Sequence, residues 1–244
     1  MSESVFADRL TRLIALSPDE HALLTGVEER ERRVRRNGVL FSENDRVAEL
    51  FVLRRGMMMS YVLLDDGSRQ IQRFLFPGDL IATTSLVYAK APDTVMAVHD
   101  SSLGAIDRQA LADVVLRCPR IGLGLLALEQ VERVAMSDRL AAVGRTSAKA
   151  RVAALLLELR NRLRATAPAG IDSFAPGITQ EEMGDATGLT AVHVNRMIRQ
   201  LEEERLIGRE GGRFTIRDEA SLVRIANYID RYAGLDMGWL TVRG

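Results

Sequence analysis

Residues 178–207 constrain the fold of this chain more than any other stretch. Thr179 lies three residues before Glu182, a spacing that predicts a capping box at the start of a short helix. Gly188 then predicts a tight turn, and Thr190 can cap a second helix. Two capped helices joined by a glycine turn form either a helix-turn-helix or a plain helical hairpin.

The second helix divides into an apolar face and an exposed face. The apolar face carries Val194, Met197, Ile198 and Leu201, and the exposed face carries Ala191, Val192, Asn195, Arg196 and Arg199. A basic hairpin follows, with Gly211 and Gly212 in its turn. Together these features favour a winged helix-turn-helix, in which the second helix enters the major groove of DNA.

The exposed face of the second helix carries residue types that contact bases. Arg196 can form a bidentate contact with O6 and N7 of guanine, and Val192 can meet a thymine methyl group. His193 and Asn195 can donate hydrogen bonds to bases or phosphates. This helix is therefore the expected reader of sequence.

Phosphate contacts are expected at the edges of the motif. Thr179 and Gln180 stand at a helix start, where free N–H groups suit a phosphate, and Arg213 in the hairpin can serve the same purpose. The predicted DNA contacts are Thr179, Gln180, Thr190, Ala191, Val192, His193, Asn195, Arg196, Arg199 and Arg213.

The chain before this motif changes character twice. Residues 4–27 show helical periodicity, broken at Ser17-Pro18, where Ser17 can cap a second helix. Residues 28–107 alternate short β-branched or aromatic segments with turn signals such as Asn37-Gly38 and Asp66-Gly67. Many short strands at regular spacing predict a sandwich or a closed barrel.

A helix of roughly 25 residues is predicted after Cys118-Pro119, ending at Gly144. Leu125, Leu128, Val131 and Ala135 form one apolar stripe along it, and Met136, Leu140 and Val143 form another. The helix can pack on its own barrel, but the favoured interpretation is a dimer seam along the first stripe. Further on, a helix follows Ser147, a loop covers residues 165–177, and residues 218–232 form a last helix with Ile229 facing inward.

Composition excludes several classes of function. A single cysteine, Cys118, excludes an internal disulfide and a cysteine-clustered metal site within the chain. No apolar run reaches membrane-spanning length and the N-terminus lacks a signal-peptide core, so a cytoplasmic protein without a membrane partner is expected. The net charge is zero, but residues 145–217 hold twelve basic against nine acidic residues, an excess of three that suits a basic face. We expect no metal, no cofactor and no catalytic residue, because the sequence shows no phosphate loop and no nucleophile–base set.

Residues 188–207, GLTAVHVNRMIRQLEEERLI, closely resemble the recognition element of the Crp/Fnr transcription regulators, most of all the subgroup with His-Val-Asn-Arg in this helix. The resemblance covers nearly the whole chain, through Gly38-x-Leu40, Gly56, Asp66-Gly67, Pro77-Gly78-Asp79 and the helix after Pro119. It implies an α+β fold with a cyclic-nucleotide-binding-like β-roll (residues 1–117), a long dimerisation helix (118–144) and a winged helix-turn-helix domain (145–244). It also implies a bacterial homodimer that binds a pseudo-palindromic site on double-stranded DNA and recruits RNA polymerase.

The chain departs from the cAMP sensors of this family. Those proteins hold the ribose with a Glu and the phosphate with an Arg-Ser/Thr pair, and the corresponding places here fall on Thr83, Asp93 and Thr94. A carboxylate at Asp93 would repel a cyclic phosphate, so cAMP is not expected. A different, unidentified small-molecule effector could still use a pocket of Gly78, Asp79, Thr83, Thr84, Asp93 and Thr94.

Other family properties are similarly restricted. The oxygen-sensing branch uses a cluster of N-terminal cysteines, which a single cysteine excludes. His21 and His99 leave haem formally open, although isolated histidines are more often ordinary residues. Ala191 and Val192 stand where family members often carry Arg-Glu or Glu, so the preference for the base next to the Arg196 contact should differ.

The sequence thus predicts a sequence-specific DNA-binding transcription regulator that is not an enzyme. The alternative is a ligand-binding regulatory module that acts on a protein partner, with the winged helix as its docking surface.

Overall fold

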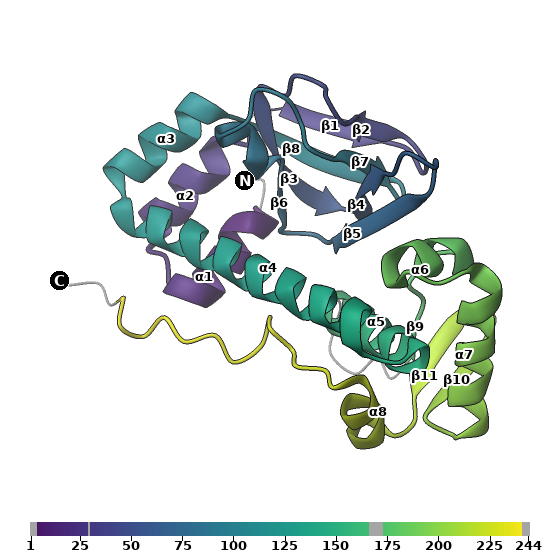
Figure 1. The fold of residues 1–244 in the computed structure, drawn as a ribbon. Helices are drawn as coiled ribbons and strands as arrows, with labels where there is room; N and C mark the ends of the chain where they lie inside the picture. Colours follow the sequence, from purple (N-terminus) through teal and green to yellow (C-terminus); the bar gives the residue numbers. More distant parts are fainter. Residues whose placement is uncertain (1–3, 29, 166–172, 241–244) are drawn as a thin grey trace. The chain divides into compact units, whose positions relative to one another are not determined.

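The computed structural model describes residues 4–28, 30–165 and 173–240, drawn as a ribbon in Figure 1. They fall into two compact units, described separately below. The first unit lies within residues 1–62, 74–133 and 234–244, and the second within residues 63–73 and 134–233. Among the described residues, no helix has both the length and the apolar character needed to cross a bilayer.

Two short helices open the first unit, as predicted. α1 (Val5–Ile14) is capped by Ser4, whose side chain accepts a hydrogen bond from a first-turn N–H group. α2 (Pro18–Gly26) begins with the expected capping box, in which the Ser17 hydroxyl and the Glu20 carboxylate each accept the other residue's N–H. Local capping therefore sets where both helices start.

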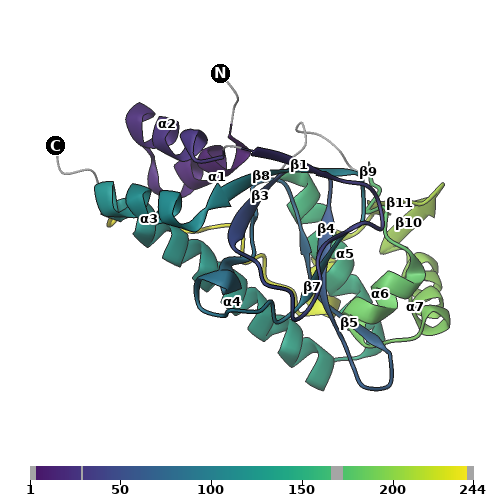
Figure 2. The same ribbon diagram turned by 90° about the horizontal axis from the view of Figure 1, so that it is seen from above.

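The predicted β-roll is confirmed as two four-stranded sheets, antiparallel in every pairing described. One has the order β1-β8-β3-β6 and the other β2-β7-β4-β5. Seen from above, β1, β8 and β3 lie on one side of the roll and β4 and β7 on the other (Figure 2). The strands are β1 (Arg30–Val34), β2 (Val39–Phe41), β3 (Glu49–Arg55), β4 (Met58–Leu63), β5 (Arg69–Leu75), β6 (Leu80–Ile81), β7 (Thr94–Ala97) and β8 (Ser101–Asp107).

The edge strand β1 gives no strand signal in the sequence, because four of its five residues are charged. Its register with β8 runs from Arg30 opposite Ala105 to Val34 opposite Ser101, and only Val34 is buried. Arginines suit such an edge, because exposed charges discourage pairing with another chain.

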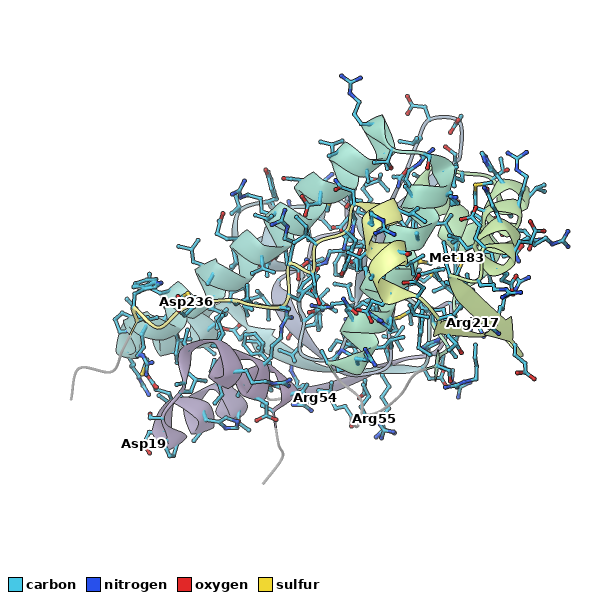
Figure 3. All side chains as sticks on the ribbon, turned by 90° about the horizontal axis from the view of Figure 1, so that it is seen from below. Asp19, Arg54, Arg55, Met183, Arg217 and Asp236 are labelled. Atoms are coloured by element: carbon cyan, nitrogen blue, oxygen red, sulfur yellow. The ribbon has the colours of Figure 1, made fainter. Side chains whose placement is uncertain are left out.

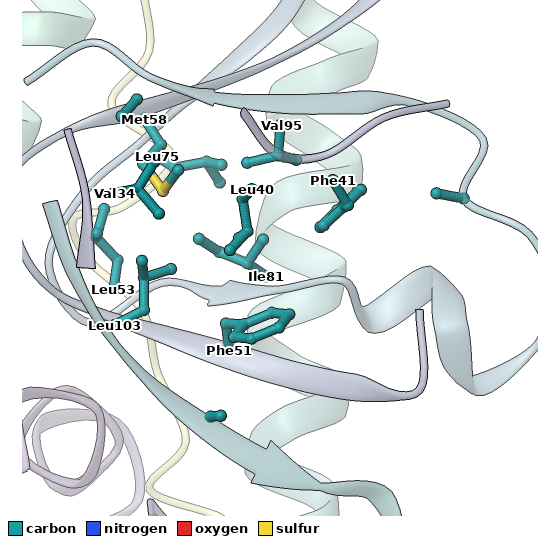
Figure 4. Packing of buried hydrophobic residues seen from close by; sticks show 13 residues of the cluster. Val34, Leu40, Phe41, Phe51, Leu53, Met58, Leu75, Ile81, Val95 and Leu103 are labelled. Carbon is teal, nitrogen blue, oxygen red and sulfur yellow. The ribbon is translucent and has the colours of Figure 1, made fainter. Parts of the chain in front are cut away.

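The space between the two sheets is filled by apolar side chains (Figure 4). Thirteen buried residues form this cluster: Val34, Leu40, Phe41, Phe51, Leu53, Met58, Leu75, Ile81, Ala91, Val95, Ala97, Leu103 and Ala105. Apart from the weakly accepting Met58 sulfur, their side chains offer no hydrogen-bonding group. Apolar side chains therefore pack together between the two sheets, and the buried polar residues of the roll include Ser60, Asp79 and Thr94.

A second group of buried residues, here called the helical cluster, lies among α1, α2, α3 (Arg108–Arg117), α4 (Pro119–Arg145) and the facing residues of the roll. Its buried members are Phe6, Ala7, Leu10, Ile14, Leu24, Leu50, Val52, Ile106, Leu111, Val114 and Ile121. Gly124 permits α1 to lie against α4, because a Cβ there would stand 2.9 Å from the methyl carbons of Leu10 and Ile14.

The apolar stripe predicted as the dimer seam is largely covered by the chain itself. Leu125 and Leu128 pack against the helical cluster, and Val131 and Ala135 are buried. These four side chains are therefore already used in the chain's own packing. The exposed apolar residues of α4 are instead Leu123, Leu126, Met136, Leu140 and Val143, which include the whole second stripe.

The second unit contains the predicted winged helix-turn-helix. Its elements are α5 (Ala148–Arg164), β9 (Ser173–Phe174), α6 (Gln180–Thr187), α7 (Ala191–Glu203), β10 (Ile207–Glu210), β11 (Arg213–Ile216) and α8 (Glu219–Ala226). The three strands of this motif follow the order β10-β11-β9. β9 lies inside the predicted loop, whose residues 166–172 are outside the described part of the chain.

The last helix is shorter than predicted. α8 ends at Ala226 because Asn227 adopts the left-handed conformation, with φ of 48°, and its N–H bonds back to the last turn. Ile229, predicted to face inward, is 57% exposed. Residues beyond Asn227 therefore do not continue the apolar face of the helix.

Candidate nucleic-acid interface

The start of α6 is fixed by the predicted capping box. The N–H of Glu182 donates to the Thr179 hydroxyl at 3.1 Å, and the Thr179 N–H donates to the Glu182 carboxylate at 2.6 Å. The expectation that the Thr179 N–H is free for a phosphate is therefore wrong, because the capping box itself uses that group. The N–H of Gln180, the first residue of α6, has no intrahelical acceptor and remains suited to an anion.

The turn between α6 and α7 depends on two glycines. Gly188 has φ of 67°, the left-handed conformation expected at the end of α6. Gly184 lies inside α6, where an added Cβ would stand 2.4 Å from the carbonyl oxygen of Leu189. The N–H of Leu189 also donates to the Gly184 carbonyl at 3.0 Å. Backbone contacts thus set how closely the two helices approach.

α7 buries the predicted apolar face and exposes the predicted polar one. Thr190 caps the helix by accepting the N–H of His193 at 3.2 Å. The buried residues are Val194, Met197, Ile198 and Leu201, and Met183 of α6 (labelled in Figure 3) is buried as well. One face of α7 is therefore held by packing while the other stays accessible.

Polar side chains of α5 bind the C-terminal ends of α6 and α7. The Arg151 guanidinium donates to the carbonyl of Thr187 at the end of α6, at 2.7 Å. Lys149 pairs with Glu204 just after α7, at 2.8 Å. The hydrogen bond from Lys149 lowers the pKa of the Glu204 carboxyl. Polar contacts from one helix thus hold the ends of both reading-motif helices.

The exposed face of α7 presents one apolar side chain and two arginines to solvent. Val192 is 82% exposed, and Arg196 and Arg199 are exposed as well. Within the described part of the chain, no residue pairs with the guanidinium of Arg196 or Arg199. The Gln180 amide donates to the Asn195 side chain at 3.4 Å, which brings a predicted phosphate contact beside a predicted base contact. Ala191 and His193 are partly exposed on the same helix.

The wing is a hairpin of β10 and β11, with Gly211 and Gly212 both at positive φ in its turn. Arg213 is exposed, but its guanidinium donates to Ser173 of β9, at 2.8 Å to the carbonyl oxygen. Phe214 pairs in register with Phe174, and their rings lie 5.9 Å apart. Arg213 thus bridges two wing strands, and a phosphate contact would compete with that bridge.

Sequence reasoning missed a second set of contacts to α6. Arg69 donates to the Asp185 carboxylate at 2.7 Å, and the Gln70 amide donates to the Asp185 carbonyl at 2.8 Å. Residues 69 and 185 lie 116 positions apart in the chain, so no local spacing could reveal them. These contacts tie the segment 63–73 to the reading motif within the second unit.

Two of the residues predicted for a ligand pocket, Gly78 and Asp79, lie in a turn that packs against α1. Asp79 is buried, pairs with Arg9 of α1, and accepts the N–H of Phe76 at 2.8 Å. Gly78 also packs on α1, since a Cβ there would stand 3.1 Å from the Val5 carbonyl oxygen. Gly78 and Asp79 therefore hold a turn against α1, and their part in a ligand pocket stays a prediction.

The remaining pocket residues lie in the roll. Thr83 and Thr84 are half-buried in a short 3-10 helix (Thr83–Leu86). Asp93 accepts a hydrogen bond from the Ser60 hydroxyl, and the Thr94 hydroxyl accepts the N–H of Glu43 at 2.9 Å. Asp93 and Thr94 are thus each hydrogen-bonded within the roll.

The two histidines considered for haem differ in their surroundings. The His21 ring contacts the Asp8 carboxylate at 2.9 Å, and the backbone N–H of His99 donates to the Met57 carbonyl at 3.0 Å. Across the described ranges, no three His, Cys, Asp or Glu side chains gather as a metal site would require.

Two family models match this chain. The Crp-like helix-turn-helix domain matches residues 150–225, and the cyclic nucleotide-binding domain matches residues 31–118. The fumarate and nitrate reduction regulatory protein of Escherichia coli (strain K12) is 24% identical over 219 residues, covering 88% of this chain and 86% of that protein.

Solved structures share the same architecture. FixK2 from Bradyrhizobium japonicum is similar at a TM-score of 0.72 and 26% identity, covering 80% of this chain and 96% of that one. A CooA mutant from Carboxydothermus hydrogenoformans has a TM-score of 0.69 at 16% identity, covering 87% of this chain and 93% of that one, which supports the fold.

Proposed function

The chain belongs to the Crp/Fnr family of DNA-binding transcription regulators, and from that premise we propose that it binds a pseudo-palindromic site as a homodimer. The carrying observation is the exposed face of α7, where Val192 and Arg196 project from a helix whose other face is buried. In the proposed complex, Arg196 reads a guanine, Asn195 and Gln180 act together at the adjoining base and phosphate, and each protomer occupies one half-site.

The proposed dimer forms along the exposed stripe of α4. Leu126 and Leu140 are two heptads apart, and Met136 and Val143 are one heptad apart, the spacing of a coiled-coil seam. All four are exposed in the single chain, and Leu140 is 75% exposed. This assignment replaces the first stripe, whose side chains pack within the chain.

The proposed regulator does not respond to cAMP. Two points support this: Asp93 carries a carboxylate at the position where the family resemblance implies a phosphate-binding Arg, and apolar side chains pack together between the two sheets. An unidentified effector, or the abundance of the protein itself, would then control it. Titration with cAMP at millimolar concentration should leave the DNA affinity unchanged, and a rise would contradict the proposal.

The remaining partners follow from the proposed role. A bacterial transcription regulator acts in the cytoplasm, where it meets the chromosome and RNA polymerase, and it needs no catalytic residue of its own. We therefore propose no enzymatic activity for this chain.

Replacing Arg196 with alanine tests the DNA-reading proposal. A site is first selected from a random duplex library, and the affinities of the wild type and the variant are measured for that site and its single-base variants. Arg196→Ala should lose about 1–3 kcal/mol of discrimination at one base pair, because one bidentate contact disappears. Arg145→Ala, at another exposed arginine of the same unit, should keep full discrimination. If the Arg196 variant stays equally specific, the assignment of α7 as the reader is wrong.

The same titrations address the alternative of a module that acts on a protein partner. DNA binding through phosphates weakens steeply with salt, since each neutralised phosphate releases counterions. Binding without salt dependence and without a preferred site would favour the protein-partner alternative.

A further inference from the structure

The chain continues beyond α8 as a segment of turns and bends that lacks helix and strand through residue 240. In the second unit, side chains hold this segment at three successive residues. Asp230 accepts from the Asn161 amide at 2.9 Å, Arg231 pairs with Asp138 at 2.6 Å, and the Arg162 guanidinium lies 4.1 Å from the Tyr232 ring centre. Residues 230–232 are therefore bound to side chains of α4 and α5.

The next residues belong to the first unit. Met237 and Leu240 pack against the helical cluster, the same group that Leu125 and Leu128 of α4 contact. Figure 3 marks Asp236 on this part of the segment. The apolar stripe first expected to form a dimer thus contributes to a cluster that the chain's own C-terminal residues help to cover.

Local structure in residues 234–240 brings the two apolar side chains together. The Asp236 carboxylate accepts the N–H of Gly238 at 2.8 Å, and the N–H of Leu240 donates to the Met237 carbonyl at 2.8 Å, closing a turn. Leu235 and Trp239 stay exposed while Met237 and Leu240 are half-buried. This selective burial indicates a specific docking mode.

We propose that residues 234–240 form a clasp: an intramolecular ligand of the helical cluster whose docking restrains the DNA-reading unit. The chain passes between the two units at residues 62–63, 73–74, 133–134 and 233–234, and the docked clasp fixes the segment that follows the last of these crossings. A second unit that is restrained at one more of its crossings has less conformational freedom to lose when two readers bind adjacent half-sites. Docking therefore favours DNA binding. The effect of the clasp on DNA binding rests on the proposed function, whereas the docking of residues 234–240 on the helical cluster does not.

Hydrogen exchange in the full-length protein tests the docking. The double variant Met237→Ser, Leu240→Ser removes the two anchoring side chains, and Leu235→Ser is the matched control, because Leu235 is 44% exposed in the same segment. Exchange of the Gly238 and Leu240 amides should become about tenfold faster in the double variant, because the undocked state becomes about tenfold more populated. That is the change expected when two half-buried side chains, equivalent to about one buried apolar side chain, are lost. It should be unchanged in the control. Unchanged exchange in the double variant would overturn the docking.

DNA affinity tests the restraint. The double variant should bind the selected site roughly three- to tenfold more weakly, a typical size for coupling between sites, while the control binds as the wild type does. If the double variant shows faster amide exchange but binds DNA as tightly as the wild type, the docking of the clasp is supported and its effect on DNA binding is refuted. A wild-type protein that binds no DNA would instead refute the proposed function. Light scattering completes the test: a dimer that the double variant abolishes would mean that the clasp docks on a partner chain, contrary to the proposal.

Discussion

Replacing Gly184 with alanine tests how the reading motif is built. An added Cβ would stand 2.4 Å from the Leu189 carbonyl oxygen and 3.5 Å from the Ala191 nitrogen. Both are backbone atoms at the entrance to α7, so no flexible side chain can move away to make room. The α6–α7 turn itself must shift, and with it the N-terminal end of α7 that carries the predicted base contacts.

Two effects of opposite sign decide the magnitude. Alanine is favoured over glycine inside a helix by about 1 kcal/mol. Overpacking typically costs about 1–3 kcal/mol, and an overlap of roughly 1 Å against rigid backbone belongs at the upper end of that range. We therefore expect a net loss of about 1–2 kcal/mol. For a unit of this size, that loss lowers the unfolding midpoint by roughly 5–10 °C.

The measurement is thermal unfolding followed by far-ultraviolet circular dichroism, together with affinity for the selected DNA site. Gly144→Ala is the matched control, because Gly144 also lies in a helix but an added Cβ there meets no atom within 4 Å. That control should be neutral or slightly stabilising. If Gly184→Ala is as stable as Gly144→Ala and binds DNA normally, the close helix approach described here is incorrect.

Three further predictions follow from other contacts. Leu140→Glu should weaken dimerisation at least about 100-fold by analytical ultracentrifugation, because it places two carboxylates in one apolar seam; an intact dimer would exclude the proposed seam. Arg54→Met should cost about 3–5 kcal/mol of unfolding free energy in urea, because it removes the charged partner of the buried Glu28 carboxylate, which Arg54 contacts at 2.9 Å. Adding Glu28→Gln should restore part of the loss. The Arg160 hydrogen bond lowers the pKa of Glu219 from 4.5, so the pair stabilises the fold above that value and is lost as pH falls through the lowered pKa. The unfolding temperature of Glu219→Gln should therefore fall less than that of the wild type as the pH is lowered, and the difference should be small because Glu219 is 54% exposed. An equal fall in both proteins would rule out a stabilising role for this pair.

Elements marked by short-range chemistry could be predicted from the sequence. The Thr179–Glu182 capping box, the Thr190 cap and the Gly188 turn each depend on residues within four positions, and all three appear in the structure. Their consequences were harder to predict. The capping box that identifies α6 also uses the Thr179 N–H that was expected to bind a phosphate.

Features decided by distant neighbours could not be predicted. Periodicity located two apolar stripes on α4, but packing against residues far away in the sequence determines that Leu125 faces the chain's own core. The Arg69–Asp185 contact and the Arg213–Ser173 bridge depend on pairs far apart in sequence. β1 is a strand because it pairs with β8, whereas its charged residues argue against one.

The clasp has a consequence for how the protein is made. Met237 and Leu240 complete a cluster whose other members all lie within residues 5–128. While the second unit is synthesised, the part of that cluster that Met237 and Leu240 cover stays exposed, because these two residues follow the second unit in the chain. Newly made, incomplete chains therefore present an apolar surface that finished chains cover, which gives a chaperone or a protease a means of telling one from the other.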